Sequence, residues 1–376
     1  MVTGTDLVQW QLEVAAGNRL PQLQDELQCT GHAFEARIYA ENTDTGFLPD
    51  TGRLTHLRAP TPSRDVRVET GVRSGDTISV HYDPMIAKLV VHGQDRQEAL
   101  RRLAWALSEY EVVGVHTNIG FLQRLARSPD FAAGLVETGY IDKHRDELFP
   151  PADSKSAREG VALAGLALML NRAEIAARDT QGSARSPWAA QDAFRIASPG
   201  LQTAQVLLDG RQYRVDLSLS TLSVTDVADG HTVAAYDNVK PEWTPPQSAT
   251  GASLRVLLGD RLCAATAVFS PKDASVTIFD QGDAMTFQVP QPKYFDEDVA
   301  ASGGSVTAPM SCKIVQVLVE AGAQVAKDTP LVVLEAMKME HVIKAPAAGT
   351  VTDVYYKVGE LVDEGKSLVA FEPDSK

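Results

Sequence analysis

The chain has 376 residues, 44% hydrophobic and 22% charged, and is long enough for two or three globular domains. Its 49 acidic residues outnumber its 35 basic ones, and the resulting charge of −14 argues against a nucleic-acid backbone or an anionic membrane as the main partner. The three cysteines are widely spaced and odd in number, which favours free thiols. They also show no metal-ligand spacing, so no metal site is expected.

Residues 1–150 mix helical and strand patterns and are expected to form one α+β domain. From Phe34 to Glu41 apolar and polar residues alternate strictly, which is typical of a half-buried strand. The predicted elements are a helix from Asp6 to Ala16, strands over 34–41, 77–82 and 85–91, and helices over 100–110 and 119–125.

Residues 151–296 are expected to form a second, mainly β domain. The apolar run "VALAGLALML" predicts a helix near its start. Seven short apolar runs between Leu201 and Val289, separated by glycine-containing turns, predict an antiparallel barrel or sandwich. The Gly/Ser-rich segment 297–305 is expected to be a flexible linker.

Residues 306–374 contain an internal repeat with a shift of 37 residues. The shift places Gly322 on Gly359 and Glu335 on Glu372. Two copies of a four-strand unit predict a small barrel with approximate two-fold symmetry. The whole chain is therefore predicted to be multidomain, with α+β and all-β parts.

A single lysine lies at the tip of the hairpin that joins the two repeats. Lys338 stands between Met337 and Met339, and apolar runs at 331–334 and 342–343 flank the segment. A joining hairpin held by strands is expected to expose the lysine amine and not to bury it. The alternative is an ordinary solvated lysine that carries nothing.

The run "EAMKMEH", within "LVVLEAMKMEHVIKAPAAGTV", resembles the biotin-carrier domain of biotin-dependent carboxylases. The resemblance implies that a biotin protein ligase joins biotin to Lys338 through an amide bond, and that Met337 and Met339 make soft contacts around the cofactor or in a partner pocket. A lipoyl domain shares this architecture, but its usual Asp-Lys-Ala tip is absent here. Cys312 and Asp328 stand where the family usually has glycine, and each is expected to strain a turn slightly.

"GHAFEARIYAE", "GFLPDTGRL" and "VHYDPMIAKLVV" are together similar to the C-terminal part of biotin carboxylase. This resemblance implies that Arg37 contacts bicarbonate and the biotin ureido oxygen, where a fixed guanidinium stabilises negative charge. Glu35 and Glu41 share its strand face, and Tyr82 and Asp83 lie near this site in the family. The alternatives are a surface ion pair for Arg37 and a turn with a capping aspartate for Tyr82-Asp83.

The ATP-binding lid and magnesium carboxylates of biotin carboxylase would precede "VTGTDL". The chain is therefore expected to be the C-terminal portion of a longer subunit that uses ATP, Mg²⁺ and bicarbonate, and to be inactive alone. "SPWAAQDAFR" resembles the start of the subunit-tethering domain of acyl-CoA carboxylases, a β-barrel around a helix.

Among the acyl-CoA carboxylases, the α subunits of the methylcrotonyl type are the most similar in "VVGVHTNIGFL" and "EAMKMEHVIKAP". That resemblance implies a carboxyltransferase β subunit, a hetero-oligomer and a role in leucine breakdown. It also implies the mitochondrial matrix for a eukaryotic protein, or the cytoplasm for a bacterial one. The propionyl and geranyl types, and a non-catalytic biotin carrier and assembly module, are the alternatives.

Overall fold

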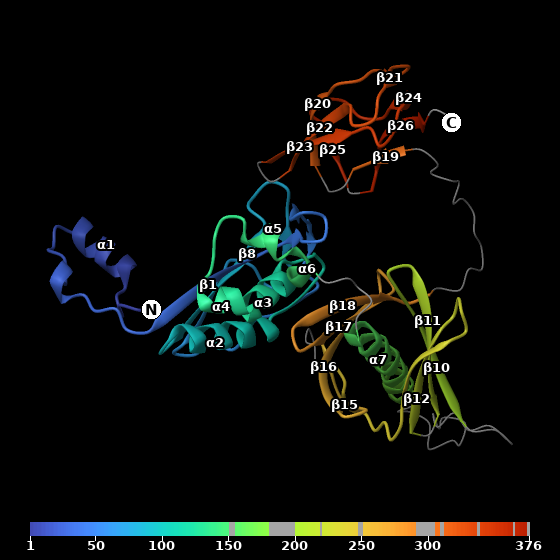
Figure 1. The fold of residues 1–376 in the computed structure, drawn as a ribbon, viewed down its shortest axis with the longest axis horizontal. Helices are drawn as coiled ribbons and strands as arrows, with labels where there is room; N and C mark the ends of the chain where they lie inside the picture. Colours follow the sequence, from blue (N-terminus) through green and yellow to red (C-terminus); the bar gives the residue numbers. More distant parts are fainter. Residues whose placement is uncertain are drawn as a thin grey trace.

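The computed structural model describes residues 1–149, 155–179, 200–218, 220–246, 251–290, 305–308, 312–336, 339–363 and 365–373 (Figure 1). Its buried apolar side chains gather in three large clusters, within 36–126, 161–287 and 308–371. We call these parts the N-terminal, middle and C-terminal domains. None of the helices described is long and apolar enough to cross a membrane.

The N-terminal domain is built on a three-stranded antiparallel sheet with the order β1-β8-β6. Its helices are α1 (Leu7–Ala15), a 3-10 turn (Gln24–Glu26), α2 (Arg96–Ser108), α3 (Ile119–Arg127), α4 (Pro129–Ala133), α5 (Tyr140–Lys143) and α6 (Arg145–Leu148). Its strands are β1 (His32–Tyr39), β2 (Glu41–Asn42), β3 (Leu48–Pro49), β4 (Gly52–Arg53), β5 (His56–Arg58), β6 (Val66–Thr70), β7 (Thr77–Ile78), β8 (Met85–Gly93) and β9 (Glu111–Val113).

Strand β1 confirms the predicted alternation, because Ala36 and Ile38 are buried whereas Glu35 and Arg37 are exposed. Helix α2 packs on β1 and β8, and α3 packs on α2. The strand predicted over 77–82 is wrong beyond Ile78. The chain turns there instead, and Asp83 Oδ1 accepts the backbone N–H of Met85 at 2.9 Å just as β8 begins.

Helix α1 begins as predicted, with the Asp6 carboxylate accepting the backbone N–H groups of Val8 and Gln9 at 3.0 Å. The helix buries none of its residues. Figure 1 shows it apart from the rest of the domain. Leu7 and Leu12 are 67% and 68% exposed, so no described part of the chain covers the apolar face of α1.

In the described part of the middle domain, one nine-stranded antiparallel sheet wraps around one helix (Figure 1). The sheet order is β13-β12-β11-β10-β18-β17-β16-β15-β14. The helix is α7 (Lys155–Asp179), and the strands are β10 (Leu201–Leu208), β11 (Arg211–Ser218), β12 (Thr221–Asp226), β13 (Thr232–Tyr236), β14 (Glu242–Thr244), β15 (Ala252–Leu258), β16 (Arg261–Ser270), β17 (Ser275–Asp280) and β18 (Asp283–Gln288).

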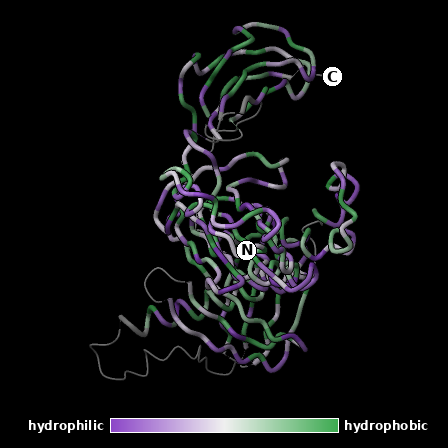
Figure 2. Tube along the Cα trace, turned by 90° about the vertical axis from the view of Figure 1, so that its left-hand side faces the viewer, coloured by the Kyte–Doolittle hydropathy of each residue, from purple (hydrophilic) through white to green (hydrophobic). Residues whose placement is uncertain are grey.

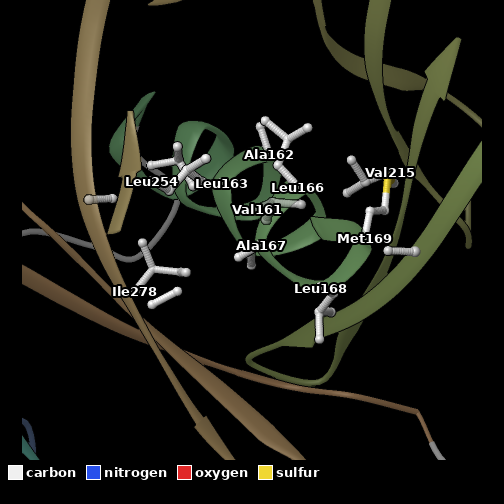
Figure 3. Close-up of a cluster of buried hydrophobic side chains, with 14 of the residues drawn as sticks. Val161, Ala162, Leu163, Leu166, Ala167, Leu168, Met169, Val215, Leu254 and Ile278 are labelled. Carbon is white, nitrogen blue, oxygen red and sulfur yellow. The ribbon is translucent and has the colours of Figure 1, made fainter. Parts of the chain in front are cut away.

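The helix supplies the centre of the middle domain's core. Val161 to Met169 turn apolar side chains toward the sheet on every side, including toward Val215, Leu254 and Ile278 (Figure 3). A helix that is apolar all round is stable only where it is enclosed in this way. The predicted barrel around a helix is therefore present as a half-barrel, because among the described residues its edge strands β13 and β14 do not pair with each other.

The C-terminal domain consists of two four-stranded sheets, with the orders β19-β26-β24-β21 and β23-β22-β20-β25. Its strands are β19 (Ser305–Thr307), β20 (Cys312–Val317), β21 (Gln324–Val325), β22 (Pro330–Ala336), β23 (Met339–Lys344), β24 (Gly349–Val354), β25 (Leu361–Val362) and β26 (Ser367–Pro373). In Figure 2 hydrophobic and hydrophilic stretches are interspersed along this domain, which carries the C-terminus.

The 37-residue repeat is confirmed strand by strand, because the shift carries β20 onto β24, β21 onto β25 and β22 onto β26. It also preserves the pairing: Lys313 opposes Glu335 in one sheet, and Thr350 opposes Glu372 in the other. Each sheet thus contains strands from both repeats, which gives the approximate two-fold symmetry that the sequence predicted.

The N-terminal domain contacts both of the other domains in this structure. Leu48, in β3, packs against the core of the C-terminal domain. On the other side, the Gln123 amide donates to the backbone oxygen of Gln281 at 3.5 Å, and the His56 ring lies 6.0 Å from the ring of Phe279.

Candidate functional site

The hairpin predicted to carry the cofactor is formed by β22 and β23. Its strands pair up to Ala336, which lies opposite Met339. Met337 and Lys338, which connect these two partners in sequence, lie outside the described residues. The base of the hairpin is rigid, because Val332 and Leu334 of β22 are 2% and 0% exposed in the domain core. The fold therefore provides a firm two-stranded support that is described as far as Ala336 and Met339.

The two glycine replacements near this hairpin have different environments. Cys312 is fully buried, and this burial raises the pKa of its thiol to about 11, so the side chain behaves as a small apolar group. Asp328 adopts a left-handed conformation with φ +65°, where its counterpart Gly365 has φ +77°. The expected backbone strain is therefore present at Asp328.

Arg37 projects from the exposed face of β1, with its side chain 58% exposed. Its Nε donates to Glu35 Oε1 at 3.4 Å. Hydrogen bonds to the side chains of Tyr39 and then Glu35 raise the pKa of the guanidinium above its ordinary value. The group is therefore a permanent positive charge that remains open to a ligand.

The other predicted residues lie around the end of β1, and the described contacts do not bring them together into one binding site. Asp83 caps the turn before β8, as the structural alternative proposed, and Tyr82 is 75% exposed. Burial raises the pKa of the Glu41 carboxyl, and the nearby negative charge of Asp83 raises it further. Of the two glutamates expected on the strand face of Arg37, Glu35 is the one seen in contact with it.

Sequence reasoning missed Asn118, which bridges backbone groups on either side of Ile38. Its Oδ1 accepts the backbone N–H of Tyr39 at 3.0 Å, and its Nδ2 donates to the backbone oxygen of Arg37 at 3.1 Å. An asparagine directly before a helix is expected to cap that helix. The local sequence therefore gave no sign that Asn118 bonds to a distant strand. In the part of the chain that the structure describes, no group of three or more His, Cys, Asp or Glu residues could hold a metal ion.

Two family models match the chain. Residues 35–143 match the biotin carboxylase C-terminal domain, and residues 303–371 match the family described as biotin-requiring enzyme. These matches contain Arg37 and Lys338 respectively.

Curated relatives extend the similarity over nearly the whole chain. The mitochondrial methylcrotonoyl-CoA carboxylase subunit alpha of Dictyostelium discoideum is 40% identical over 98% of this chain and 52% of its own length. The same subunit of Mus musculus is 38% identical over 100% of this chain and 52% of its own length. The mitochondrial propionyl-CoA carboxylase alpha chain of Homo sapiens is 30% identical over 99% of this chain and 50% of its own length.

The chain thus spans about half the length of the curated relatives it matches. Among solved structures, the biotin carboxylase subunit of pyruvate carboxylase is 36% identical over 40% of this chain and 33% of its own, with a TM-score of 0.39. Two family models thus match separate parts of a single polypeptide, and relatives up to 40% identical match nearly its whole length. The chain is therefore similar to a biotin carboxylase C-terminal domain over residues 35–143, to a biotin-requiring enzyme over residues 303–371, and as a whole to the alpha subunits of acyl-CoA carboxylases.

Proposed function

We propose that this chain is the biotin-carrying portion of the α subunit of a 3-methylcrotonyl-CoA carboxylase. The observation that carries the proposal is the 38–40% identity to methylcrotonoyl-CoA carboxylase alpha subunits over nearly the whole chain, against 30% to a propionyl-CoA carboxylase alpha chain. The full subunit would carboxylate biotin with ATP, Mg²⁺ and bicarbonate. A carboxyltransferase β subunit would then pass the carboxyl group to the acyl-CoA, in leucine breakdown. These relatives are named mitochondrial, which supports a mitochondrial location for the enzyme if this chain is eukaryotic.

Lys338 is the proposed attachment point. Its side-chain nitrogen, as the neutral amine, attacks the biotin acyl-adenylate that a biotin protein ligase makes, and the amide bond forms as AMP leaves and the nitrogen loses a proton. The residues fit this role, because β22 and β23 pair up to the residues next to the tip and anchor it in the domain core. Met337 and Met339 provide adaptable apolar contacts beside the attachment point. Bound biotin supplies a carrier for a carboxyl group.

Arg37 is the proposed charge-stabilising residue of the carboxylation site. Its exposed guanidinium binds bicarbonate and holds negative charge that develops on the acceptor, and Glu35 restrains its orientation. An arginine guanidinium is protonated over the whole working pH range, and the hydrogen bonds to Tyr39 and Glu35 raise its pKa further. Tyr82 and Asp83 are proposed to line the same region from the turn before β8.

The attachment point is tested by replacing Lys338 with arginine in cells that contain an active biotin ligase. We expect Lys338→Arg to abolish streptavidin labelling while the circular dichroism spectrum stays unchanged, since arginine keeps the charge but cannot accept the acyl group. Lys344→Arg, at the far end of β23, is the matched control and should label normally. Labelling of the Lys338→Arg chain would move the attachment site elsewhere.

Substrate choice is tested with the full-length subunit and its co-purified β partner. We expect carboxylation of 3-methylcrotonyl-CoA to exceed that of propionyl-CoA and geranyl-CoA in kcat/KM. A higher kcat/KM for propionyl-CoA would instead assign the chain to a propionyl-CoA carboxylase. Failure to recover any β partner would favour the non-catalytic carrier and assembly module.

A further inference from the structure

The position of Arg37 depends on a strand that, among the described strands, has no neighbour on one side. Strand β1 lies at the edge of its sheet, where the order is β1-β8-β6. The pairing with β8 is also irregular at this point, because Ile38 opposes Ala87 whereas the next residue, Tyr39, opposes Met85. The unmatched residue at this shift is Ile86 of β8, and an edge strand beside such an irregularity leaves backbone groups without a ladder partner and is easily bent.

Asn118 supplies the missing partner at this place. The backbone groups of residues two apart in a strand point to the same side, and one carboxamide serves both Arg37 and Tyr39. It donates from Nδ2 to the Arg37 oxygen at 3.1 Å and accepts from the Tyr39 N–H at 3.0 Å. The backbone N–H of Asn118 adds a third bond, to the Tyr39 oxygen at 3.3 Å. The side chain thus acts as a short substitute for a neighbouring strand.

The residue makes these bonds instead of the one its position usually favours. Asn118 is the N-cap residue of α3, yet its side chain accepts no hydrogen bond from the first turn of that helix. It is only 6% exposed, so solvent does not compete for the carboxamide. A buried amide whose donor and acceptor are both satisfied by one strand fixes the distance between that strand and the helix.

We infer that Asn118 is a positioning residue that fixes the backbone of Arg37, and with it the guanidinium, relative to α3. This inference rests on the proposed function of Arg37. A strand that carries a charge-stabilising group must hold it to within a fraction of an ångström, because small displacements of such groups are costly to the rate.

The first test uses this chain and measures amide hydrogen exchange at Tyr39 by NMR. Asn118→Ser is the informative variant, because serine is a good N-cap for α3 but cannot bridge two backbone groups. We expect exchange at Tyr39 to accelerate about tenfold or more when its acceptor is lost. Gln123→Ala is the matched control: it removes another buried amide of α3, one that bonds to Gln281 and not to β1, and should leave Tyr39 unchanged.

The second test measures bicarbonate-dependent carboxylation of biotin by the full-length subunit. We expect Asn118→Ser to lower kcat about tenfold, with the KM for ATP unchanged, and we expect Gln123→Ala to keep the parental rate. In an Arg37→Ala background the effect of Asn118→Ser should disappear, because the variant acts through Arg37.

The outcomes separate the two hypotheses. If Arg37→Ala alone leaves carboxylation unchanged, the proposed role of Arg37 fails, whatever the exchange at Tyr39 shows. If Arg37→Ala slows the reaction but Asn118→Ser does not, or if the two losses simply multiply, the positioning role of Asn118 is refuted. Unchanged exchange at Tyr39 in Asn118→Ser would refute it as well.

Discussion

Asp328 and Gly365 occupy the same turn in the two repeats of the C-terminal domain. The backbone N–H of Asp328 donates to the Ala345 oxygen at 2.9 Å, and that of Gly365 donates to the Ala308 oxygen at 2.9 Å. Both residues have positive φ angles, but glycine alone adopts this conformation without a steric cost. One turn is therefore relaxed and its copy is strained.

We expect Asp328→Gly to stabilise the C-terminal domain by about 1 kcal/mol. Left-handed backbone costs an L-residue roughly 1–2 kcal/mol, and the greater freedom of glycine in the unfolded chain offsets part of the gain. Urea denaturation of the chain measures the change. The converse variant, Gly365→Asp, should lower the free energy of unfolding by a similar amount. A Cβ added at Gly365 would meet nothing within 4 Å, so backbone strain is the main cost. If Asp328→Gly and Gly365→Asp both have the same free energy of unfolding as the parent chain, this turn is not strained.

At the scale of single elements, α7 shows how closely the helix and the sheet of the middle domain approach. A Cβ atom added at Gly165 would lie 2.5–2.6 Å from three side-chain atoms of Val215. A Cβ added at Gly160 would lie 2.5 and 2.8 Å from the terminal methyl group and the sulfur of Met285, a flexible side chain that can move away, and 3.2 Å from the Phe287 ring. The two glycines are therefore not equivalent, although they lie on one helix.

We expect Gly165→Ala to lower the free energy of unfolding of the middle domain by about 2 kcal/mol. Overpacking against the branched Val215 outweighs the gain of roughly 1 kcal/mol that alanine brings to a helix. Gly160→Ala is the matched control and should be nearly neutral. Thermal unfolding followed by circular dichroism compares them, and a Gly165→Ala chain as stable as the parent would contradict this account of the helix–sheet contact.

Local sequence patterns predicted most elements but not the shortest ones. Seven strands of the middle domain follow from apolar runs between glycine turns, whereas β13 and β14 were missed because they are short and lie at the sheet edges. Residues 79–82 have strand-forming composition, yet they turn because the chain must reverse before β8. Pairing and chain reversal are tertiary constraints, and residue propensity alone does not contain them.

At the scale of the whole molecule, the N-terminal domain meets the C-terminal domain through Leu48. Its neighbour Phe47 is held on the other side by aromatic contacts with Phe121 and Phe149, at ring distances of 5.1 and 6.0 Å. Phe47 lies in the bend just before β3, with a positive φ of 64°, and Leu48, the first residue of β3, packs against the core of the C-terminal domain. One partly buried leucine contributes at most about 2 kcal/mol, which suits a contact that forms and breaks.

We expect Leu48→Asp to release the C-terminal domain from this contact. A carboxylate against an apolar core is unfavourable, so the released domain should tumble faster in ¹⁵N relaxation measurements. Leu257→Asp, at a half-exposed leucine of β15, is the matched control and should leave the relaxation of the C-terminal domain unchanged. Unchanged relaxation in Leu48→Asp would show that Leu48 does not hold the two domains together.

The candidate sites were only partly accessible from the sequence, and the reason is distance along the chain. The Met-Lys-Met segment and its repeat lie within 37 residues of each other, so pattern alone located the hairpin. Asn118 bonds to backbone groups 79 and 81 residues away, and Leu48 contacts a different domain. Contacts of that range depend on the folded arrangement of several elements and leave no local pattern.

The two-fold symmetry of the C-terminal domain also decides where the polypeptide is tied to it. The same operation that relates the repeats places the start of β19 and the end of β26 where the other copy has its β22–β23 hairpin. Figure 1 accordingly shows β23 and β19 on opposite sides of the domain. The chain therefore enters the domain at Ser305, at the end opposite to the β22–β23 hairpin, which leads to the proposed attachment point. A rotation of the domain about Ser305 would consequently move that hairpin farther than any part of the domain close to β19.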